Sequence, residues 1–147
     1  MILIFSLLTL IMSELTIKGK WKNELGSIMN ITEFEEKIFS GTYYTSVGEV
    51  KKGDGNPLYG TYNIEPWVDE KGDKHTSFLV TINVQWINRK EKGSNPSCTT
   101  WNGKCDLSED EKEVNGIDTS WLLRRFTTSF KNWDGIIMGK DYFVKYE

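Results

Sequence analysis

Seven polar side chains suited to direct ligand contact fall on strand-like runs, on the same face of those runs as several tryptophans. A strand sends alternate side chains to opposite sides, so residues two apart share a face. The polar members of this face are Asn23, Ser27, Tyr43, Thr45, Ser97, Thr99 and Asp141. A polar group left unpaired in a core costs about 1–3 kcal/mol, so these residues are too many to be core filling. They favour a site that hydrogen-bonds one polar molecule between indole rings.

Catalysis and metal binding find little support among the other residues. The single histidine, His75, stands beside Lys74 in a polar segment where we expect it to be solvated, and the chain has no Gly-x-Ser-x-Gly motif. Tyr43 and Asp141 could imitate an acid–base pair, but no nucleophile accompanies them. In the acidic stretch 106–113, Glu111 stands where a calcium-binding EF-hand loop needs glycine. The sequence therefore predicts neither an enzyme nor a metal site.

The two cysteines, Cys98 and Cys105, lie seven residues apart. On one strand, at about 3.3 Å per residue, that spacing separates them by roughly 23 Å, which is far beyond the reach of a disulfide. Structural zinc needs four ligands, and two cysteines with one histidine do not supply them. We expect both thiols to be free.

Short alternating runs between turn residues make up most of the chain, and no helical periodicity persists over a substantial length. The predicted strands are Gly19–Asn23, Ser27–Thr32, Ile38–Thr45, Leu58–Pro66, Phe78–Trp86, Ser97–Lys104, Gly116–Arg125 and Gly135–Tyr146. Turn-like segments separate them, among them Gly53–Pro57 and Asp69–Asp73. This order fits an all-β, eight-stranded antiparallel up-and-down β-barrel, whose interior is just large enough for one small ligand. We expect the site at the barrel mouth, and Trp21 and Phe39 in the core.

Length and charge narrow the possible partners. The 147 residues fit one domain, and a net charge of −3 without any block of Lys or Arg argues against nucleic acid. The apolar run Met1–Ser13 is too short to span a bilayer and resembles a secretory signal peptide, although it lacks Lys and Arg. The alternative for this run is a buried first strand. The expected organisation is a signal peptide at 1–13 and a single barrel domain at 14–147, secreted and without a membrane partner.

Several motifs on these runs resemble those of the avidin and streptavidin family. The segment Gly19–Ser27, GKWKNELGS, is similar to the opening strand of avidins. The other matching segments are Phe39–Gly48, Trp86, Thr99–Gly103, Thr119–Leu123 and Gly139–Phe143. They keep the family's order, and nearly its spacing, from Gly19 to the last residues. The resemblance implies a barrel that binds biotin with high affinity, with no cofactor and no catalytic residue.

The resemblance also implies a role for each matching residue. Asn23, Ser27 and Tyr43 are expected to donate to the ureido oxygen of biotin. Thr45 and Asp141 are expected to accept from its ureido N–H groups, with Thr99 facing the ring sulfur. The residues expected to line the apolar parts of the ligand are Trp86, Trp101, Trp121, Leu25, Val47 and Leu123. The residues expected near its carboxylate are Ser97, Gly48 and Glu49, although the charge of Glu49 could repel it.

Assembly is implied in the same way. Trp133 resembles the tryptophan that a subunit of this family lends to its neighbour's pocket, which implies a homotetramer, although a packed surface aromatic is the other interpretation. The outward residues expected between barrels are Leu122, Met138, Tyr142 and Val144. Cys105 matches a position that avidin bridges to a cysteine near the N-terminus, and here Leu15 stands at that counterpart, so the bridge is expected to be absent.

Two other functions stay open on the sequence. One is an avidin-fold oligomerisation module whose ligand binding is lost or weak. The other is a lipocalin-like carrier, which shares the eight-stranded architecture but holds larger apolar ligands. The number of polar groups on the inward face argues against both, because such groups lower stability unless something pairs with them.

Overall fold

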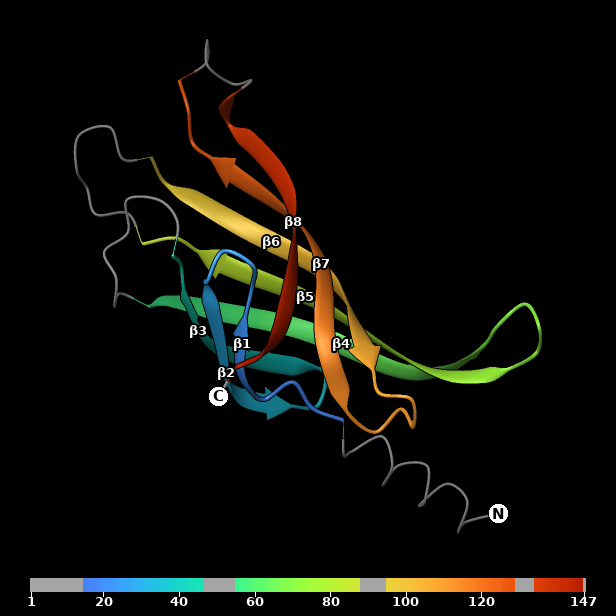
Figure 1. Cartoon of the computed structure of the whole chain (residues 1–147). Coiled ribbons are helices and arrows are strands. Elements are labelled where there is room, and N and C mark those ends of the chain that lie inside the picture. The colour runs from blue at the N-terminus through green and yellow to red at the C-terminus, as the bar shows by residue number, and fades with distance from the viewer. Residues whose placement is uncertain (1–14, 47–54, 88–94, 129–133, 147) are drawn as a thin grey trace.

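The chain forms a closed barrel of eight antiparallel strands, each hydrogen-bonded to its neighbour in sequence and the last to the first (Figure 1). This computed structural model describes residues 15–46, 55–87, 95–128 and 134–146. The strands are β1 Gly19–Lys22, β2 Ile28–Glu35, β3 Ile38–Tyr44, β4 Asn56–Val68, β5 Lys74–Gln85, β6 Ser97–Leu107, β7 Val114–Arg125 and β8 Ile136–Tyr146. The predicted fold class is confirmed. The predicted signal peptide, 1–13, lies outside the described residues.

Two predicted turns have different outcomes. The turn after β4 is confirmed: Asp69 N donates to Asp73 O and Gly72 N to Asp69 O, both at 3.0 Å, and Gly72 takes a φ of 86° that favours glycine. The turn Gly53–Pro57 is wrong at its end, because Asn56 pairs with Tyr43 and Pro57 with Thr42 as the first residues of β4. The ladder with β3 overrides the turn tendency of an Asn-Pro pair there.

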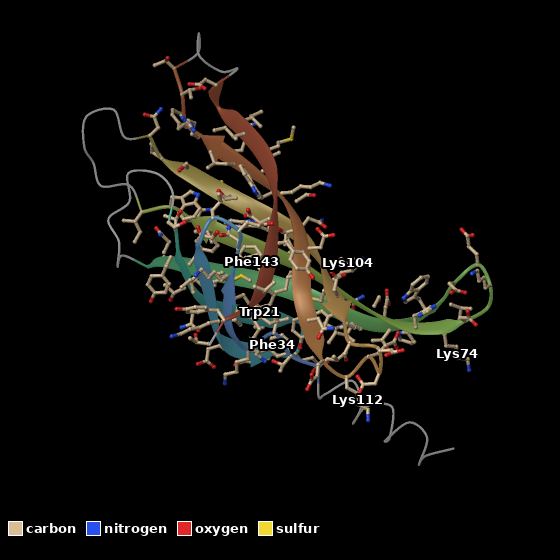
Figure 2. All side chains as sticks on the ribbon, in the orientation of Figure 1. Trp21, Phe34, Lys74, Lys104, Lys112 and Phe143 are labelled. Carbon is tan, nitrogen blue, oxygen red and sulfur yellow. The ribbon has the colours of Figure 1, made fainter. Side chains whose placement is uncertain are left out.

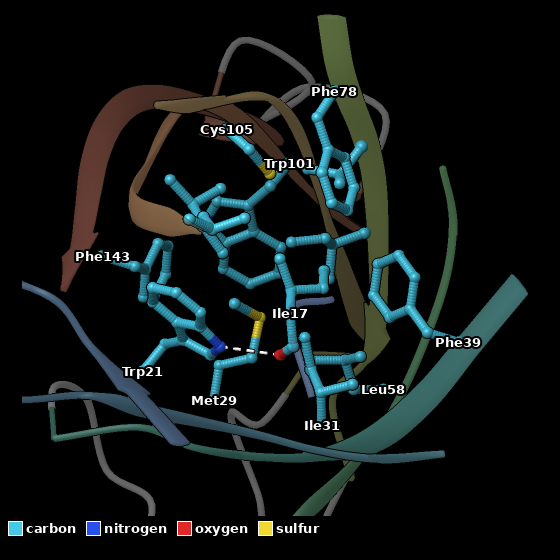
Figure 3. Close-up of a cluster of buried hydrophobic side chains, with 14 of the residues drawn as sticks. Ile17, Trp21, Met29, Ile31, Phe39, Leu58, Phe78, Trp101, Cys105 and Phe143 are labelled. Atoms are coloured by element: carbon cyan, nitrogen blue, oxygen red, sulfur yellow. Dashed lines mark hydrogen bonds between the residues drawn. The ribbon is translucent and has the colours of Figure 1, made fainter. Parts of the chain in front are cut away.

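Buried apolar side chains from the strands form one core cluster inside the barrel (Figure 3). Trp21 and Phe39 are 1% and 3% exposed, which confirms their predicted place in the core. The segment before β1 also contributes, because Ile17 is fully buried and its carbonyl accepts from Trp21 Nε1 at 2.8 Å. Figure 2 shows the labelled Trp21 and Phe143 within the barrel and Lys74 out on the projecting β4–β5 hairpin.

The hairpin of β4 and β5 extends beyond the barrel wall (Figure 1). β3 pairs with β4 only as far as Thr61, and β6 pairs with β5 only from Leu79 onward, whereas β4 and β5 pair as far as Val68 and Lys74. We call the hairpin outside the wall, residues 65–77, the ribbon, because Ile64 and its partner Phe78 still pack in the core. An isolated two-stranded hairpin is marginally stable, so contacts with the rest of the molecule matter for it.

The β6–β7 turn contacts the ribbon through Glu111, next to His75. His75 Nε2 lies 2.8 Å from Asp69 Oδ2, and its Nδ1 lies 3.6 Å from Glu111 Oε1. Glu111 also accepts from the Thr76 backbone N–H at 3.1 Å. The His75 side chain stays 37% exposed, in keeping with the expected solvation, and two carboxylates pair with its ring in addition.

The two cysteines point to opposite sides of β6. Cys98 is half-buried and Cys105 is buried in the core, and neither is bonded to another cysteine. The prediction of free thiols is confirmed. Leu15, which stands at the position where avidin has the bridging cysteine, is buried at 3% exposure. No helix within the described ranges is long and apolar enough to cross a membrane.

Candidate functional site

The polar face predicted from the sequence gathers at one end of the barrel, where β1 turns into β2, β3 and β5 end and β6 begins. Five of its members are almost fully buried, and their exposed fractions are 6% for Asn23, 1% for Ser27, 3% for Tyr43, 3% for Thr99 and 7% for Asp141. Buried polar groups need partners. Their hydrogen bonds therefore show which atoms are committed to the fold and which can serve a ligand.

The β1–β2 turn fixes the amide of Asn23. Its Oδ1 accepts from the backbone N–H groups of Leu25 at 3.1 Å and Ser27 at 2.9 Å. The turn closes through Gly26, whose φ of 86° suits glycine and whose N–H donates to Asn23 O at 3.1 Å. Because the oxygen is committed to the turn, the NH₂ end of Asn23 is the end that can donate elsewhere.

Ser46, just after β3, fixes the hydroxyl of Ser27. Ser27 Oγ accepts from Ser46 N at 3.0 Å and lies 3.3 Å from Ser46 Oγ. The Ser46 hydroxyl itself donates to Leu25 O. The proton of the Ser27–Ser46 pair therefore belongs to Ser27, whose hydroxyl acts as a donor.

Tyr43 stands in the centre of an aromatic cluster. Its ring stacks on Trp101 with centroids 5.0 Å apart and meets the edge of Trp86 at 5.5 Å. Burial raises the pKa of Tyr43 far above its ordinary value, the hydrogen bond with Ser27 opposes that rise, and the nearby charges of Asp141 and Glu24 add to it. The phenol is therefore neutral and remains a hydrogen-bond donor at ordinary pH.

Asp141 is held by two neighbours. Its Oδ2 accepts from Trp101 Nε1 at 2.9 Å, and its backbone carbonyl accepts from the Thr119 hydroxyl at 2.8 Å. None of the ion pairs among the described residues involves Asp141. A carboxylate accepts about four hydrogen bonds, so this buried group can take further N–H donors.

Tryptophans form the remaining wall. Trp86 Nε1 donates to Thr99 Oγ1 at 2.7 Å, and the Trp86 ring meets Trp101 at 6.3 Å and 67°. Trp121 is half-buried on β7, opposite Gly139 of β8. Its Nε1 is buried and finds no acceptor among the described residues.

The structure brings together eight of the predicted residues and places others at the margin or outside the described chain. Those in the cluster are Asn23, Ser27, Tyr43, Trp86, Thr99, Trp101, Trp121 and Asp141. Thr45, Ser97 and Leu123 are half-buried at the strand ends, and Leu25 is 60% exposed in the β1–β2 turn. Val47, Gly48, Glu49 and Trp133 lie outside the described residues.

Sequence reasoning missed two supporting residues, Ser46 and Asn56. Asn56 is 2% exposed, and its side chain accepts from Ile87 N at 3.0 Å and donates to Tyr43 O at 3.5 Å, so it joins the ends of β3 and β5. The Asn-Pro pair indicated a turn, which hid this role. Ser46 carried no signal beyond its place next to Thr45.

The cluster has a definite chemical preference. Tyr43 lies near both Ser27 and Asp141, the Trp101 indole holds Asp141, and Asn23 is buried at the same end of the barrel. Such a set suits a flat, uncharged group that carries a carbonyl oxygen and N–H groups. No group of three or more His, Cys, Asp or Glu within the described ranges is placed to hold a metal ion.

Comparison with known proteins gives consistent results. A family model described as the Avidin family matches residues 12–146. Avidin of Gallus gallus is 30% identical over 136 residues, covering 88% of this chain and 78% of that protein. Avidin-related protein 4/5 of Gallus gallus is 28% identical over 132 residues, covering 88% of this chain and 77% of that protein.

Two solved structures are similar as well. The crystal structure of Xenavidin has a TM-score of 0.67 at 27% identity and covers 89% of this chain and 98% of that one. The X-ray structure of biotin binding protein from chicken has a TM-score of 0.64 at 29% identity, and the match covers 89% of this chain and 96% of that one.

Proposed function

Because this chain belongs to the avidin family, we propose that it binds biotin non-covalently and with high affinity at the mouth of its barrel. Proteins of this family bind biotin without a cofactor and without catalysing a reaction. The observation that carries the proposal for this chain is the buried, neutral Tyr43 phenol beside Ser27 and Asp141.

The ureido oxygen of biotin is the acceptor that fits the three donors. Asn23 presents its NH₂ end because the turn occupies its oxygen. Ser27 keeps the bond that its oxygen accepts from Ser46 N and turns its proton from the long, 3.3 Å contact with Ser46 Oγ to the ligand. Tyr43 supplies the third donor. Hydrogen bonds in a buried site are electrostatically stronger than in water, so three of them favour a polarised ureido group.

The ureido N–H groups pair with Asp141 and Thr45. Asp141 lacks a cationic partner among the described residues, and its charge offsets the polarisation induced at the oxygen. Thr99 accepts from Trp86, so its own proton is available to face the ring sulfur, a weak acceptor. Rings of Trp86, Trp101 and Trp121 cover the apolar parts of the ligand, with Leu25, Val47 and Leu123 at its margin.

The carboxylate of biotin lies at the rim, close to Ser97 and the segment that contains Gly48 and Glu49. The negative charge of Glu49 weakens this end of the site, whereas the ureido end is unaffected. We therefore place most of the recognition at the ureido group.

The biological form that we propose is a secreted homotetramer, with residues 1–13 as the signal peptide and 14–147 as the mature domain. Trp133 completes the pocket of a neighbouring subunit. Support comes from exposed apolar side chains on β7 and β8, where Leu122, Met138 and Val144 are 39%, 73% and 47% exposed. A strand face of this kind favours burial against another subunit.

An oligomerisation module without a ligand remains the second candidate, since the same outer face serves it equally well. Such a module does not require the buried polar side chains of Asn23, Ser27, Tyr43 and Asp141. Buried polar groups lower stability unless they are paired, which argues against this candidate. A lipocalin-like carrier also has no use for this set, because its ligands are apolar.

A titration of tryptophan fluorescence with biotin tests the proposal. Because indole rings surround the site, binding changes the emission at one equivalent per chain. The control ligand is an analogue in which an imino group replaces the ureido oxygen, and we expect it to bind more weakly because its protonated form cannot accept from the three donors. No change of emission with biotin contradicts the proposal.

A further inference from the structure

Trp121 lines the site, and no hydrogen bond of its side chain among the described residues fixes the position of its ring. Its indole N–H is buried and has no acceptor among the described residues. The N–H groups of the other two tryptophans in the cluster both donate, from Trp86 to Thr99 and from Trp101 to Asp141. Among the described residues, therefore, packing is what sets where the Trp121 ring stands.

Gly139 is the residue on which the Trp121 ring rests. The two residues are direct cross-strand partners on β7 and β8. A Cβ atom built at Gly139 would lie 2.4 Å from Trp121 Cζ2, 2.7 Å from Cε2 and 3.1 Å from Nε1. Atoms in ordinary contact stand about 3.5–4.0 Å apart, so the indole occupies the space that any other side chain at this position would need.

The reason for glycine here is space. Gly139 is not among the described glycines with a positive φ, so an alanine could adopt its backbone conformation. The inward side of β8 continues from Gly139 to Asp141, two residues on, and Asp141 is the proposed ureido partner. A side chain at 139 would push the indole off β8, into the interior where the ligand's rings are placed.

We propose that Gly139 is a positioning residue of the ligand site, whose bare backbone seats the Trp121 indole against β8 and keeps that side of the site open. This role rests on the proposed function, because the ring that it positions is a wall of the biotin site.

Gly139→Ala provides the direct test. Overpacking of about 1–3 kcal/mol corresponds to an affinity for biotin that is roughly fivefold to 150-fold weaker. Trp121→Ala weakens binding by losing the wall. Adding Gly139→Ala to Trp121→Ala should change the affinity less than about twofold, since coupled sites lose their combined effect once the contact is gone. If the loss of binding free energy in the double variant equals the sum of the losses in Gly139→Ala and Trp121→Ala, the proposal is overturned.

Gly116→Ala is a matched control. A Cβ at Gly116 would lie 2.1 Å from the hydroxyl oxygen and 2.5 Å from Cζ of Tyr142, so this strand glycine also lies beneath an aromatic ring, but outside the site. We expect Gly116→Ala to bind biotin as the wild type does. An equal loss of affinity in both glycine variants would assign the effect to general strand strain and overturn the proposal.

A readout without ligand separates this inference from the proposed function. With 5-fluorotryptophan incorporated and the Trp121 fluorine resonance assigned by its loss in Trp121→Phe, Gly139→Ala should shift that resonance and Gly116→Ala should not. If the wild type fails to bind biotin but Gly139→Ala still shows this shift, the proposed function is refuted and the Gly139 role stands. An unshifted resonance overturns the role of Gly139.

Folding of the variants is itself informative. If Gly139→Ala alone does not fold, Trp121→Ala should restore the fold in the double variant, because the clash is with that ring. A double variant that also fails to fold contradicts the assignment of the contact.

Discussion

Tyr43 and Asp141 are the buried residues whose side-chain atoms carry the proposed recognition. Removal of the phenol oxygen in Tyr43→Phe, or of the carboxylate in Asp141→Ala, leaves a ligand group unpaired. We expect each to weaken biotin binding by about 1–3 kcal/mol, with circular dichroism showing a folded barrel. Binding calorimetry measures the loss.

Two neighbours serve as matched controls for these variants. Tyr44 follows Tyr43 on β3 with its side chain 39% exposed, and Asp118 is an exposed carboxylate on β7. Tyr44→Phe and Asp118→Ala should bind biotin unchanged. If Tyr43→Phe or Asp141→Ala also bound as tightly as the wild type, its assigned contact with the ureido group would be wrong.

The thiols of Cys98 and Cys105 should differ sharply in reactivity. Burial, together with the nearby charge of Asp106, raises the pKa of Cys105 to about 12, whereas Cys98 is half-buried. Because the thiolate is the reactive form, an aromatic disulfide reagent at pH 8 should modify Cys98 in the folded protein and both thiols after denaturation. Prompt modification of Cys105 in folded Cys98→Ser would contradict its placement in the core.

A raised thiol pKa also has a consequence for stability. The unfolded chain releases the Cys105 proton near the usual value of 9.0, and the folded chain does so only near 12. The stability that Cys105 contributes is therefore fully present below pH 9.0 and decreases as the pH rises from 9.0 towards 12.

Single residues were predictable where their type and their strand position agreed. Asn23, Ser27, Tyr43 and Asp141 combine polar chemistry with an inward register, and the structure buries all four. Asn56 was not predictable as a supporting residue, because its role depends on the β3–β4 register and on a bond to Ile87. Such long-range partners leave no trace in local spacing.

At the scale of elements, the ribbon of β4 and β5 depends on His75. Its hydrogen bond to Asp69, with the charge of that residue and of Glu111, raises the pKa of His75 above 6.5. The same bond lowers the pKa of Asp69 below 3.8. The folded state gains from charged His75 fully below pH 6.5 and loses that gain as the pH rises through the raised pKa. The gain from Asp69 is present above pH 3.8 and is lost as the pH falls through its lowered pKa.

His75 is the only histidine, so one imidazole resonance in an NMR titration reports the effect. We expect a pKa above 6.5 in the wild type and a decrease in Asp69→Asn, because the hydrogen bond to Asp69 is the largest cause. Asp73→Asn, in the same turn, is the control and should leave the titration nearly unchanged. An unperturbed wild-type titration would contradict the pairing of the His75 ring with Asp69.

The elements themselves were largely predictable, because period-two alternation between turn residues marks each strand. The full length of the ribbon was not. The sequence ended its strands at Pro66 and began the next at Phe78, whereas pairing continues to Val68 and Lys74. Outside the barrel neither face is buried against the core, so polar residues such as Glu65 and Lys74 obscure the alternation on which strand prediction depends.

For the whole molecule, assembly and ligand binding should be linked. If Trp133 completes a neighbour's pocket, Trp133→Ala should release biotin faster, and Val144→Lys should reduce the mass measured by light scattering, because a charge is placed in an apolar contact. Trp67→Ala removes a ribbon tryptophan that is 48% exposed and should change neither property. A wild type that is monomeric at micromolar concentration would refute the tetramer.

Binding calorimetry of the wild-type protein with biotin tests the central claim most directly, because it gives stoichiometry and affinity without a label. A pre-formed barrel that encloses a small ligand loses little conformational freedom on binding. We therefore predict one biotin per chain with a Kd well below about 1 μM, which corresponds to roughly −8 kcal/mol. A Kd in the millimolar range, or no heat of binding, would contradict the claim that this chain is a biotin-binding protein.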